Sequence, residues 1–237
     1  MIQLYHGNAL RVLQQDIGAF DAVITDPPYA SGATLADKQR GTAGKYTGTK
    51  ARCPYPDFLG DQMDQRSWTR LMREVLAMAR DHCTPGAVLA SFIDWRNLPA
   101  LYDAAQWAGW SLRGVVVWDK LSSRPQRGRF TQQSEFLVWG SNGALPLQRG
   151  VGCLPGVYRA ANVQGIARVH QTQKPLEVMR EIVKICTPGG RILDPFAGSG
   201  TTLRAARAEG YSALGIEAHR GIAETAALRL GIAAESH

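Results

Sequence analysis

The chain of 237 residues carries a formal net charge of +7, and 45% of its residues are hydrophobic. This length and composition suffice for a full core and predict a single α/β domain over residues 1–237. No run of eighteen apolar residues and no signal-peptide pattern occurs, so we expect no membrane span and a cytoplasmic protein. The four cysteines lack the paired spacing of zinc sites or disulfide frameworks, and we expect no metal site.

Seven short apolar runs, most of them joined by segments of helical periodicity, predict a parallel sheet covered by helices on both faces. In chain order, the expected strands are Ile2–Tyr5, Ala22–Thr25, Ala87–Phe92, Leu112–Trp118, Glu135–Trp139, Arg191–Leu193 and Ser212–Ile216. The expected helices are Ala9–Gln15, Trp68–Arg80 with Ser67 as its cap, Ala100–Ala108, Pro175–Cys186, Thr201–Glu209 and Ile222–Leu230. Three long stretches lack both patterns: residues 30–64, 122–133 and 141–172. Loops of such length in a compact domain are usually functional.

The strand that ends at Thr25 leads directly into Asp26-Pro27-Pro28-Tyr29, at the edge where open α/β sheets bind their ligands. An exocyclic amine of adenine or cytosine is a poor nucleophile because its lone pair is delocalised into the ring. The carboxylate of Asp26 and the carbonyl of Pro27 could each accept one N–H and aim that lone pair at a methyl donor. Tyr29 offers a face for an extruded base, where stacking is worth about 1 to 3 kcal/mol. The simpler alternative is a proline-rich strand exit with a core tyrosine.

A second strand, Arg191–Leu193, runs into Asp194-Pro195-Phe196-Ala197-Gly198-Ser199-Gly200-Thr201 and then into a helix. Gly198 and Gly200 let the backbone approach a ligand closely. Asp194 suits a cationic amino-acid group, and Glu217, after the next strand, suits two ribose hydroxyls. These features together favour S-adenosylmethionine as the ligand.

Two other ligands and one structural alternative compete for this glycine loop. A dinucleotide site also pairs a glycine turn with an acid about twenty residues later, but Thr201-Thr202 stands where its third glycine is expected. No Gly-Lys-Ser/Thr follows, so the phosphate-binding P-loop is excluded. An ordinary tight strand-to-helix turn is the structural alternative.

The chain resembles the β group of DNA amino-methyltransferases, in which Asp-Pro-Pro-Tyr precedes the S-adenosylmethionine loop. The further matching segments are Leu4–Leu10, Trp118–Lys120, Glu135–Val138 and His170–Pro175, so the resemblance covers nearly the whole chain. It implies a Rossmann-like S-adenosylmethionine-dependent methyltransferase fold with a seven-stranded, mostly parallel sheet and a permuted motif order. In that order the strand at residues 2–5 lies beside the strand at residues 212–216.

The resemblance also assigns roles to residues at matching positions. The expected catalytic residues are Asp26, Pro27, Pro28 and Tyr29. The expected cofactor-binding residues are Asn8, Thr172, Lys174, Asp194, Phe196, Gly198, Gly200, Thr201 and Glu217. Among these, Lys174 is expected to pair with the cofactor carboxylate, and Asn8 stands where the family more often has Asp.

Asp26 at the first motif position is typical of adenine-N6 enzymes in this family, whereas cytosine-N4 enzymes usually have Ser there. We therefore expect a site-specific DNA methyltransferase that acts on the N6 amine of adenine, with cytosine-N4 as the alternative. RNA is a third candidate substrate, and a DNA-binding module with a vestigial cofactor pocket is the alternative of a different class. The intact acids Asp26, Asp194 and Glu217 disfavour that module, because no structural requirement explains all three.

The methyl donor reaches the target amine only if the base is flipped out of the duplex or the strand is already single. Residues 30–64 are expected to close over the substrate, and residues 122–172 to form a short target-recognition insertion. Basic residues clustered in these stretches are expected to contact the nucleic acid; they are Lys45, Lys50, Arg52, Lys120, Arg124, Arg127, Arg129 and Arg168. We expect a bacterial or phage-encoded protein associated with the nucleoid, with a homodimer as a candidate assembly.

Overall fold

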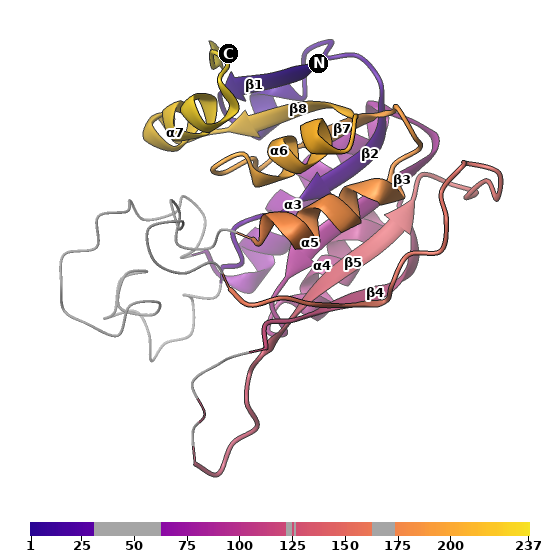
Figure 1. The fold of residues 1–237 in the computed structure, drawn as a ribbon, viewed down its shortest axis with the longest axis vertical. Helices are drawn as coiled ribbons and strands as arrows, with labels where there is room; N and C mark the ends of the chain where they lie inside the picture. Colours follow the sequence, from indigo (N-terminus) through magenta and orange to yellow (C-terminus); the bar gives the residue numbers. More distant parts are fainter. Residues whose placement is uncertain (31–62, 122–124, 126, 163–173) are drawn as a thin grey trace.

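The computed structural model of the chain describes residues 1–30, 63–121, 125, 127–162 and 174–237, which form one sheet between two layers of helices (Figure 1). The strands are β1 (Ile2–His6), β2 (Phe20–Thr25), β3 (Cys83–Ile93), β4 (Ser111–Asp119), β5 (Ser134–Ser141), β6 (Val157–Arg159), β7 (Arg191–Asp194), β8 (Ser212–Glu217) and β9 (Glu235–Ser236). Their order across the sheet is β6-β4-β5-β3-β2-β7-β8-β1-β9. β5 is antiparallel to β3 and β4, and the other pairs are parallel.

Helices from the first half of the chain cover one face of the sheet, and helices from its last quarter cover the other. The first group is α1 (Ala9–Val12), α3 (Gln65–Asp81) and α4 (Leu98–Trp107); the second is α5 (Leu176–Ile182), the 3₁₀ turn η2 (Val183–Ile185), α6 (Thr201–Ala208) and α7 (Arg220–Leu230). Side chains alternate along each strand between these two cores, so Val23 of β2 packs with the first group and its neighbours Ala22 and Ile24 with the second. Among the described residues, no helix is long and apolar enough to span a membrane.

The predicted fold class is confirmed, and all seven expected strands are present, but the sheet has nine strands rather than seven. The two additional strands, β6 and β9, are three and two residues long, too short to leave an alternating pattern in the sequence. The helix expected from Trp68 begins at Gln65, because the side chain of Asp64, not that of Ser67, caps it. Asp64 accepts hydrogen bonds from the backbone N–H groups of Arg66 and Ser67.

Four neighbouring parallel strands bring the predicted motifs to one edge of the sheet. β1 pairs with β8, with His6 opposite Glu217, as the resemblance implied. β7 pairs with both β8 and β2, and Leu193 lies opposite Val23. Because parallel strands end at the same edge, the segments that follow β1, β8, β7 and β2 gather there.

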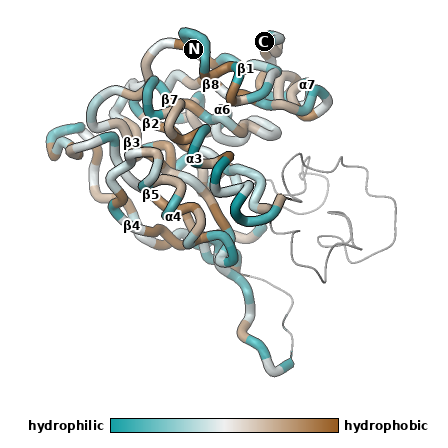
Figure 2. The backbone as a smooth tube through the Cα atoms, turned by 180° about the vertical axis from the view of Figure 1, so that it is seen from behind, coloured by the Kyte–Doolittle hydropathy of each residue, from teal (hydrophilic) through white to brown (hydrophobic). Residues whose placement is uncertain are grey.

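The connection between β4 and β5 projects away from the body of the protein, near this same edge (Figures 1 and 2). Its described residues are mostly hydrophilic, whereas hydrophobic residues concentrate along the strands. Leu121 and Phe130 are hydrophobic exceptions, and the side chain of Phe130 is fully exposed.

Candidate active site

The two predicted motifs lie side by side at the carboxyl ends of β2 and β7. The hydroxyl of Thr25, the last residue of β2, donates a hydrogen bond of 2.7 Å to Oδ1 of Asp194, the last residue of β7. Both residues are buried, and they are 169 positions apart in the chain. The turn that begins at Asp26 and the glycine loop that follows Asp194 therefore leave the sheet from adjacent strands.

Two side chains from the helical layer hold the Asp26–Tyr29 turn in place. The buried Trp68 of α3 donates its Nε1–H to the carbonyl of Pro28 at 2.6 Å. Asn97, which precedes α4, donates its amide to the carbonyl of Tyr29. Pairing of β2 stops at Thr25, so the carbonyl of Pro27 lies outside the hydrogen-bond ladder of the sheet. The sequence alone gave no sign of Trp68 or Asn97, because each acts across a long separation in the chain.

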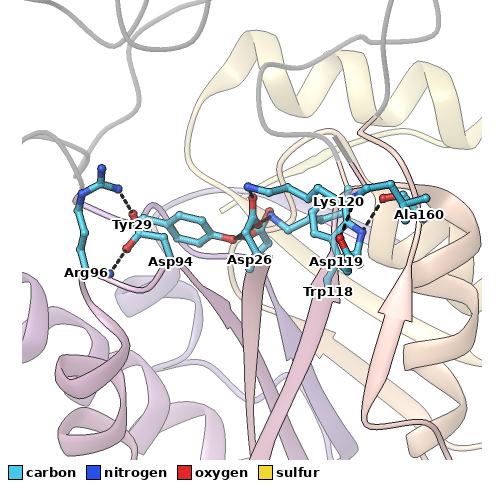
Figure 3. A network of polar contacts seen from close by, with 11 residues as sticks. Asp26, Tyr29, Asp94, Arg96, Trp118, Asp119, Lys120 and Ala160 are labelled. Carbon is cyan, nitrogen blue, oxygen red and sulfur yellow. Dashed lines mark hydrogen bonds and ion pairs between the residues drawn. The ribbon is translucent and has the colours of Figure 1, made fainter. Parts of the chain in front are cut away.

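A compact polar cluster surrounds the carboxylate of Asp26 (Figure 3). The hydroxyl of Tyr29 donates to Oδ1 of Asp26 at 2.6 Å, and the ammonium of Lys174 donates to Oδ2 at 2.6 Å. Lys174 also donates to the Tyr29 hydroxyl oxygen at 2.9 Å and lies 3.3 Å from Oε2 of Glu135. Oε1 of Glu135 in turn accepts from Lys120 at 3.3 Å. These contacts join five side chains, from β5, from the residue that follows β4 and from two loops.

Aromatic rings enclose the buried ammonium of Lys174. Its Nζ lies 5.1 Å from the ring centre of Tyr29, 4.9 Å from that of Phe92 and 5.9 Å from that of Trp118. The residue is only 4% exposed. Rings at these distances attract a cation through their negative faces, which helps a buried lysine to stay charged.

The electrostatics of the cluster follow from burial opposed by ion pairing. Burial would lower the pKa of Lys174, but Asp26 and Glu135 together raise it. Burial would raise the pKa of Glu135, but Lys174 and Lys120 lower it. Burial, followed by the negative charge of Asp26, raises the pKa of Tyr29 well above its ordinary value. Lys174 and Glu135 therefore stay charged, and Tyr29 stays a neutral phenol.

Opposing effects act on the pKa of Asp26, and the net result is a raised pKa. Burial raises the pKa of Asp26; Lys174 opposes that shift, while the negative charge of Glu135 adds to it. Asp26 thus has one ammonium beside it and one carboxylate working against it, whereas Lys174 has two carboxylates beside it. The charge state of the predicted amine acceptor depends on its two charged neighbours.

The glycine loop follows Asp194 at the end of β7, next to the Asp26 turn. Oδ1 of Asp194 accepts from the backbone N–H of Phe196 at 3.1 Å, in addition to Thr25, and burial raises the pKa of Asp194 to about 6. Gly198 has a φ of 51°, and among the described residues a Cβ built there would meet only the carbonyl oxygen of Phe196, at 4.0 Å. Gly200, with a φ of 79°, caps α6 in the left-handed conformation. The loop can therefore admit a ligand against its backbone.

Glu217 lies across from this loop at the end of β8. Its Oε2 accepts from the N–H of Gly198 at 3.0 Å, and its Oε1 accepts from the N–H of His219 at 2.7 Å. Each carboxylate oxygen can accept a further hydrogen bond, which suits a pair of hydroxyl groups. Asn8 follows β1 at the same edge and caps α1 by accepting from the N–H of Leu10 at 2.9 Å. Buried Asp194, the open face of Gly198 and the oriented Glu217 fit the amino-acid and ribose parts of S-adenosylmethionine.

The structure shows the protein contacts of some predicted site residues, and other predicted residues lie outside the part of the chain that it describes. Lys174 was predicted to pair with the cofactor carboxylate, but the contacts described here are with Asp26, Tyr29 and Glu135. Lys120 was predicted to contact nucleic acid, and it is bonded to Glu135. Arg127 and Arg129 are exposed on the β4–β5 connection. The predicted residues outside the described part of the chain are Lys45, Lys50, Arg52, Arg124, Arg168 and Thr172, as is most of the predicted closing loop, residues 30–64.

Glu135 is the member of the cluster that sequence reasoning missed as a site residue. In the sequence it is the first residue of an expected strand and of a segment that matches the family, and it is the single acid between Lys120 and Lys174. An acid in so basic a stretch is the available signal, because a glutamate is rarely buried unless it is paired. Its partners come from sequence positions 29, 120 and 174, which no local pattern connects.

Comparison with known proteins identifies the family to which this site belongs. The chain belongs to the DNA methylase family of N6 and N4 methyltransferases, whose family model matches residues 20–148 and 153–228. It is a DNA methyltransferase that uses S-adenosylmethionine. The predicted family and cofactor are thus confirmed.

Individual relatives agree with this assignment. The chain is 26% identical to the type II methyltransferase M.ScaI of Streptomyces caespitosus, over 99% of this chain and 83% of the relative. Its fold matches that of M1.HpyAVI in complex with S-adenosylmethionine with a TM-score of 0.71, at 25% identity and over 98% of this chain and 100% of the other. It also matches the fold of PvuII DNA methyltransferase, described as cytosine-N4-specific, with a TM-score of 0.70 at 15% identity, over 96% and 86% of the two chains.

Proposed function

We propose that this enzyme methylates the exocyclic N6 amine of an adenine that has been flipped out of DNA, with Asp26 as the acceptor that activates the amine. The observation that carries the proposal is the Thr25–Asp194 hydrogen bond of 2.7 Å. It joins the last residues of the two strands that the Asp26 turn and the glycine loop follow. An amine held by the first segment then lies beside a ligand held by the second.

The glycine-loop side binds the cofactor in this proposal. Asp194 accepts from the amino group of S-adenosylmethionine, Glu217 binds the ribose hydroxyls, and Gly198 and Gly200 keep the backbone accessible. Phe196 and Thr201, which belong to the segment after β7, and Asn8, which follows β1, would complete the cofactor site, and Asn8 would contact the adenine part. When bound, the cofactor supplies a methyl group activated by its sulfonium.

The Asp26 side prepares the nucleophile. Asp26 accepts one N–H of the target amine and the Pro27 carbonyl accepts the other, which draws the nitrogen toward tetrahedral geometry and exposes its lone pair. As the new N–C bond forms and the C–S bond breaks, the amine loses one proton to solvent. Each oxygen of Asp26 already accepts one hydrogen bond and has a lone pair left for the amine. The Trp68 and Asn97 contacts keep the turn rigid during this step.

Adenine is favoured over cytosine because Asp, rather than Ser, precedes Pro-Pro-Tyr. Cytosine-N4 is the second candidate, since a protein described as cytosine-N4-specific shares the fold. The carboxylate and carbonyl can serve either amine, so the shape of the base pocket decides between them. The exposed Arg127 and Arg129 on the β4–β5 connection are the described residues that we assign to DNA backbone contacts.

A label-transfer experiment tests this function. The purified enzyme is incubated with S-adenosylmethionine labelled in its methyl group and with phage DNA grown in a host that lacks DNA methylases, and the DNA is digested to nucleosides. We expect the label in N6-methyldeoxyadenosine. Label in N4-methyldeoxycytidine would overturn the base assignment, and absence of label from DNA would overturn the proposal as a whole. RNA from the same host serves as the parallel substrate.

A further inference from the structure

Glu135 contacts every other polar side chain of the cluster except Asp26. Its Oε2 lies 3.2 Å from the Tyr29 hydroxyl and 3.3 Å from the Lys174 ammonium, and its Oε1 lies 3.3 Å from Lys120. It stands on β5, the strand antiparallel to its neighbours, and only 17% of its side chain is exposed. The two groups that bind Asp26 are thus themselves bound to Glu135.

The three protons of the Lys174 ammonium match the three oxygens around it. These oxygens are Oδ2 of Asp26, the hydroxyl of Tyr29 and Oε2 of Glu135, at 2.6, 2.9 and 3.3 Å. A lysine ammonium has three donors and no acceptor, so this set satisfies it completely. Its position over Asp26 is therefore fixed by Glu135 from one side and by the aromatic rings from the other.

We propose that Glu135 and Lys174 are positioning residues for methyl transfer: Lys174 keeps the Asp26 carboxylate ionised and oriented, and Glu135 holds Lys174 and Tyr29 in place around it. This inference rests on the proposed function of Asp26. Neither residue needs to touch the reacting atoms, because both act through the charge and orientation of the Asp26 carboxylate. Lys120 supports the arrangement by balancing the charge of Glu135.

The two positioning residues act on the ionisation of Asp26 with opposite signs. The Lys174 cation favours the carboxylate, whereas the Glu135 anion, which does not bond to Asp26, favours the acid. The remaining groups that face Asp26 are the neutral phenol of Tyr29, Lys120 behind Glu135, and Asp194 on β7, whose pKa is itself raised in part by Asp26. A carboxylate is needed to accept the amine N–H, so activity falls as the pH drops through the pKa of Asp26.

The test is the pH profile of single-turnover methyl transfer by the full-length enzyme, with saturating S-adenosylmethionine and the phage DNA described above. Lys174→Met should lower the rate and move the acid limb of the profile to higher pH, because Asp26 loses its cation. Glu135→Gln keeps the shape of the side chain but removes its charge, and should move the acid limb to lower pH while lowering the plateau rate. Lys174→Arg should return the limb toward that of the wild type.

Two surface substitutions of the same types serve as matched controls. Lys184 and Glu181 pair with each other at 2.6 Å on the α5 side of the molecule, and Lys184→Met and Glu181→Gln should leave the acid limb where it is. S-adenosylmethionine binding by each variant reports whether it is folded. Acid limbs that coincide with the wild type, or that move in the same direction for both variants, would overturn the inference. If the wild type transfers no methyl group to DNA, the proposed function fails instead.

If Lys174→Met fails to fold, Lys174→Gln provides the second variant, because its amide can still donate to Asp26 without carrying a charge. It should move the acid limb in the same direction as Lys174→Met. A limb at the wild-type position in Lys174→Gln, together with an unmoved limb in Glu135→Gln, would show that the cluster is structural only.

Discussion

At the scale of single residues, the two buried aspartates of this site differ in the charged groups around them. Asp26 is held between a cation and an anion, whereas Asp194 has no described cation beside it and accepts only from neutral donors. Burial therefore raises the pKa of Asp194 to about 6, and an incoming ammonium group would supply the missing charge. If Asp194 pairs with the amino group of the cofactor, as proposed, cofactor binding should be sensitive to pH in the mildly acidic range.

We expect the affinity for S-adenosylmethionine to be constant above the pKa of Asp194 and to weaken below it. Protonated Asp194 cannot pair with the amino group of the cofactor, so affinity should fall by up to about tenfold per pH unit below about pH 6. Asp194→Asn should bind more weakly at neutral pH and show no such dependence. Calorimetric titrations from about pH 8 to about pH 5 measure both. A wild-type affinity that stays level over this range, or a dependence that survives in Asp194→Asn, would contradict the assignment.

The limits of prediction at this scale follow from the distance between partners in the sequence. Asp26 and Asp194 could be singled out because Asp26 directly follows a buried strand, Asp194 ends one, and each begins a turn of distinctive composition. Glu135, Trp68 and Asn97 could not, because their roles depend on partners 106, 40 and 68 positions away. The resemblance predicted Lys174 as a cofactor-binding residue, and the structure shows that its ammonium contacts Asp26, which is 148 positions away.

At the scale of elements, the β4–β5 connection joins the Asp26 cluster to an exposed part of the protein surface. The two ends of the connection are held together by Asp119, whose Oδ1 accepts from the backbone N–H of Leu121 at 2.9 Å and from the side-chain amide of Gln133 at 3.2 Å. Lys120 and Glu135 lie at these same two ends of the connection and belong to the Asp26 cluster. Farther out, Arg127, Arg129 and the fully exposed Phe130 face solvent. A polyanion bound to the outer part would thus lie next to the active site.

We expect Arg127→Ala and Arg129→Ala each to weaken DNA binding without changing cofactor affinity. If each arginine neutralises one phosphate, the slope of the logarithm of the binding constant against the logarithm of salt concentration should decrease by about one. Arg180→Ala is the matched control, because Arg180 is half-exposed on α5 and paired with Glu209 at the end of α6. Fluorescence anisotropy at several salt concentrations measures the slopes. Slopes equal to that of the control would remove these arginines from the DNA interface.

The elements themselves could largely be predicted, for a clear physical reason. Each of the seven expected strands contains an apolar run that the sequence shows, whereas β6 and β9 are very short and pair at the margins of the sheet with β4 and β1. The start of α3 was misplaced because Asp64 and Ser67 are both good capping residues, and only the backbone geometry shows which one caps. Pairing between strands from opposite ends of the chain was reached through the family resemblance and not through the pattern.

At the scale of the whole molecule, the order of strands explains why a divided motif becomes one site. The N-terminal strand β1 lies between β8 and β9, so both ends of the chain meet at one side of the sheet (Figure 1). The strands that carry the two motifs, β2 and β7, are neighbours in the middle of the sheet. A parallel arrangement points both motifs to the same edge, although most of the chain separates them in sequence.

The central claim is that these neighbouring strand ends perform separable halves of one reaction, and a pair of isosteric variants tests it directly. S-adenosylmethionine affinity and single-turnover methyl transfer to DNA are measured for Asp26→Asn and Asp194→Asn. We predict that Asp26→Asn binds the cofactor as the wild type does but transfers methyl groups on the order of 10² to 10³ times more slowly, whereas Asp194→Asn loses mainly cofactor affinity. Wild-type transfer by Asp26→Asn, or an equal loss of cofactor affinity in both variants, would contradict the account.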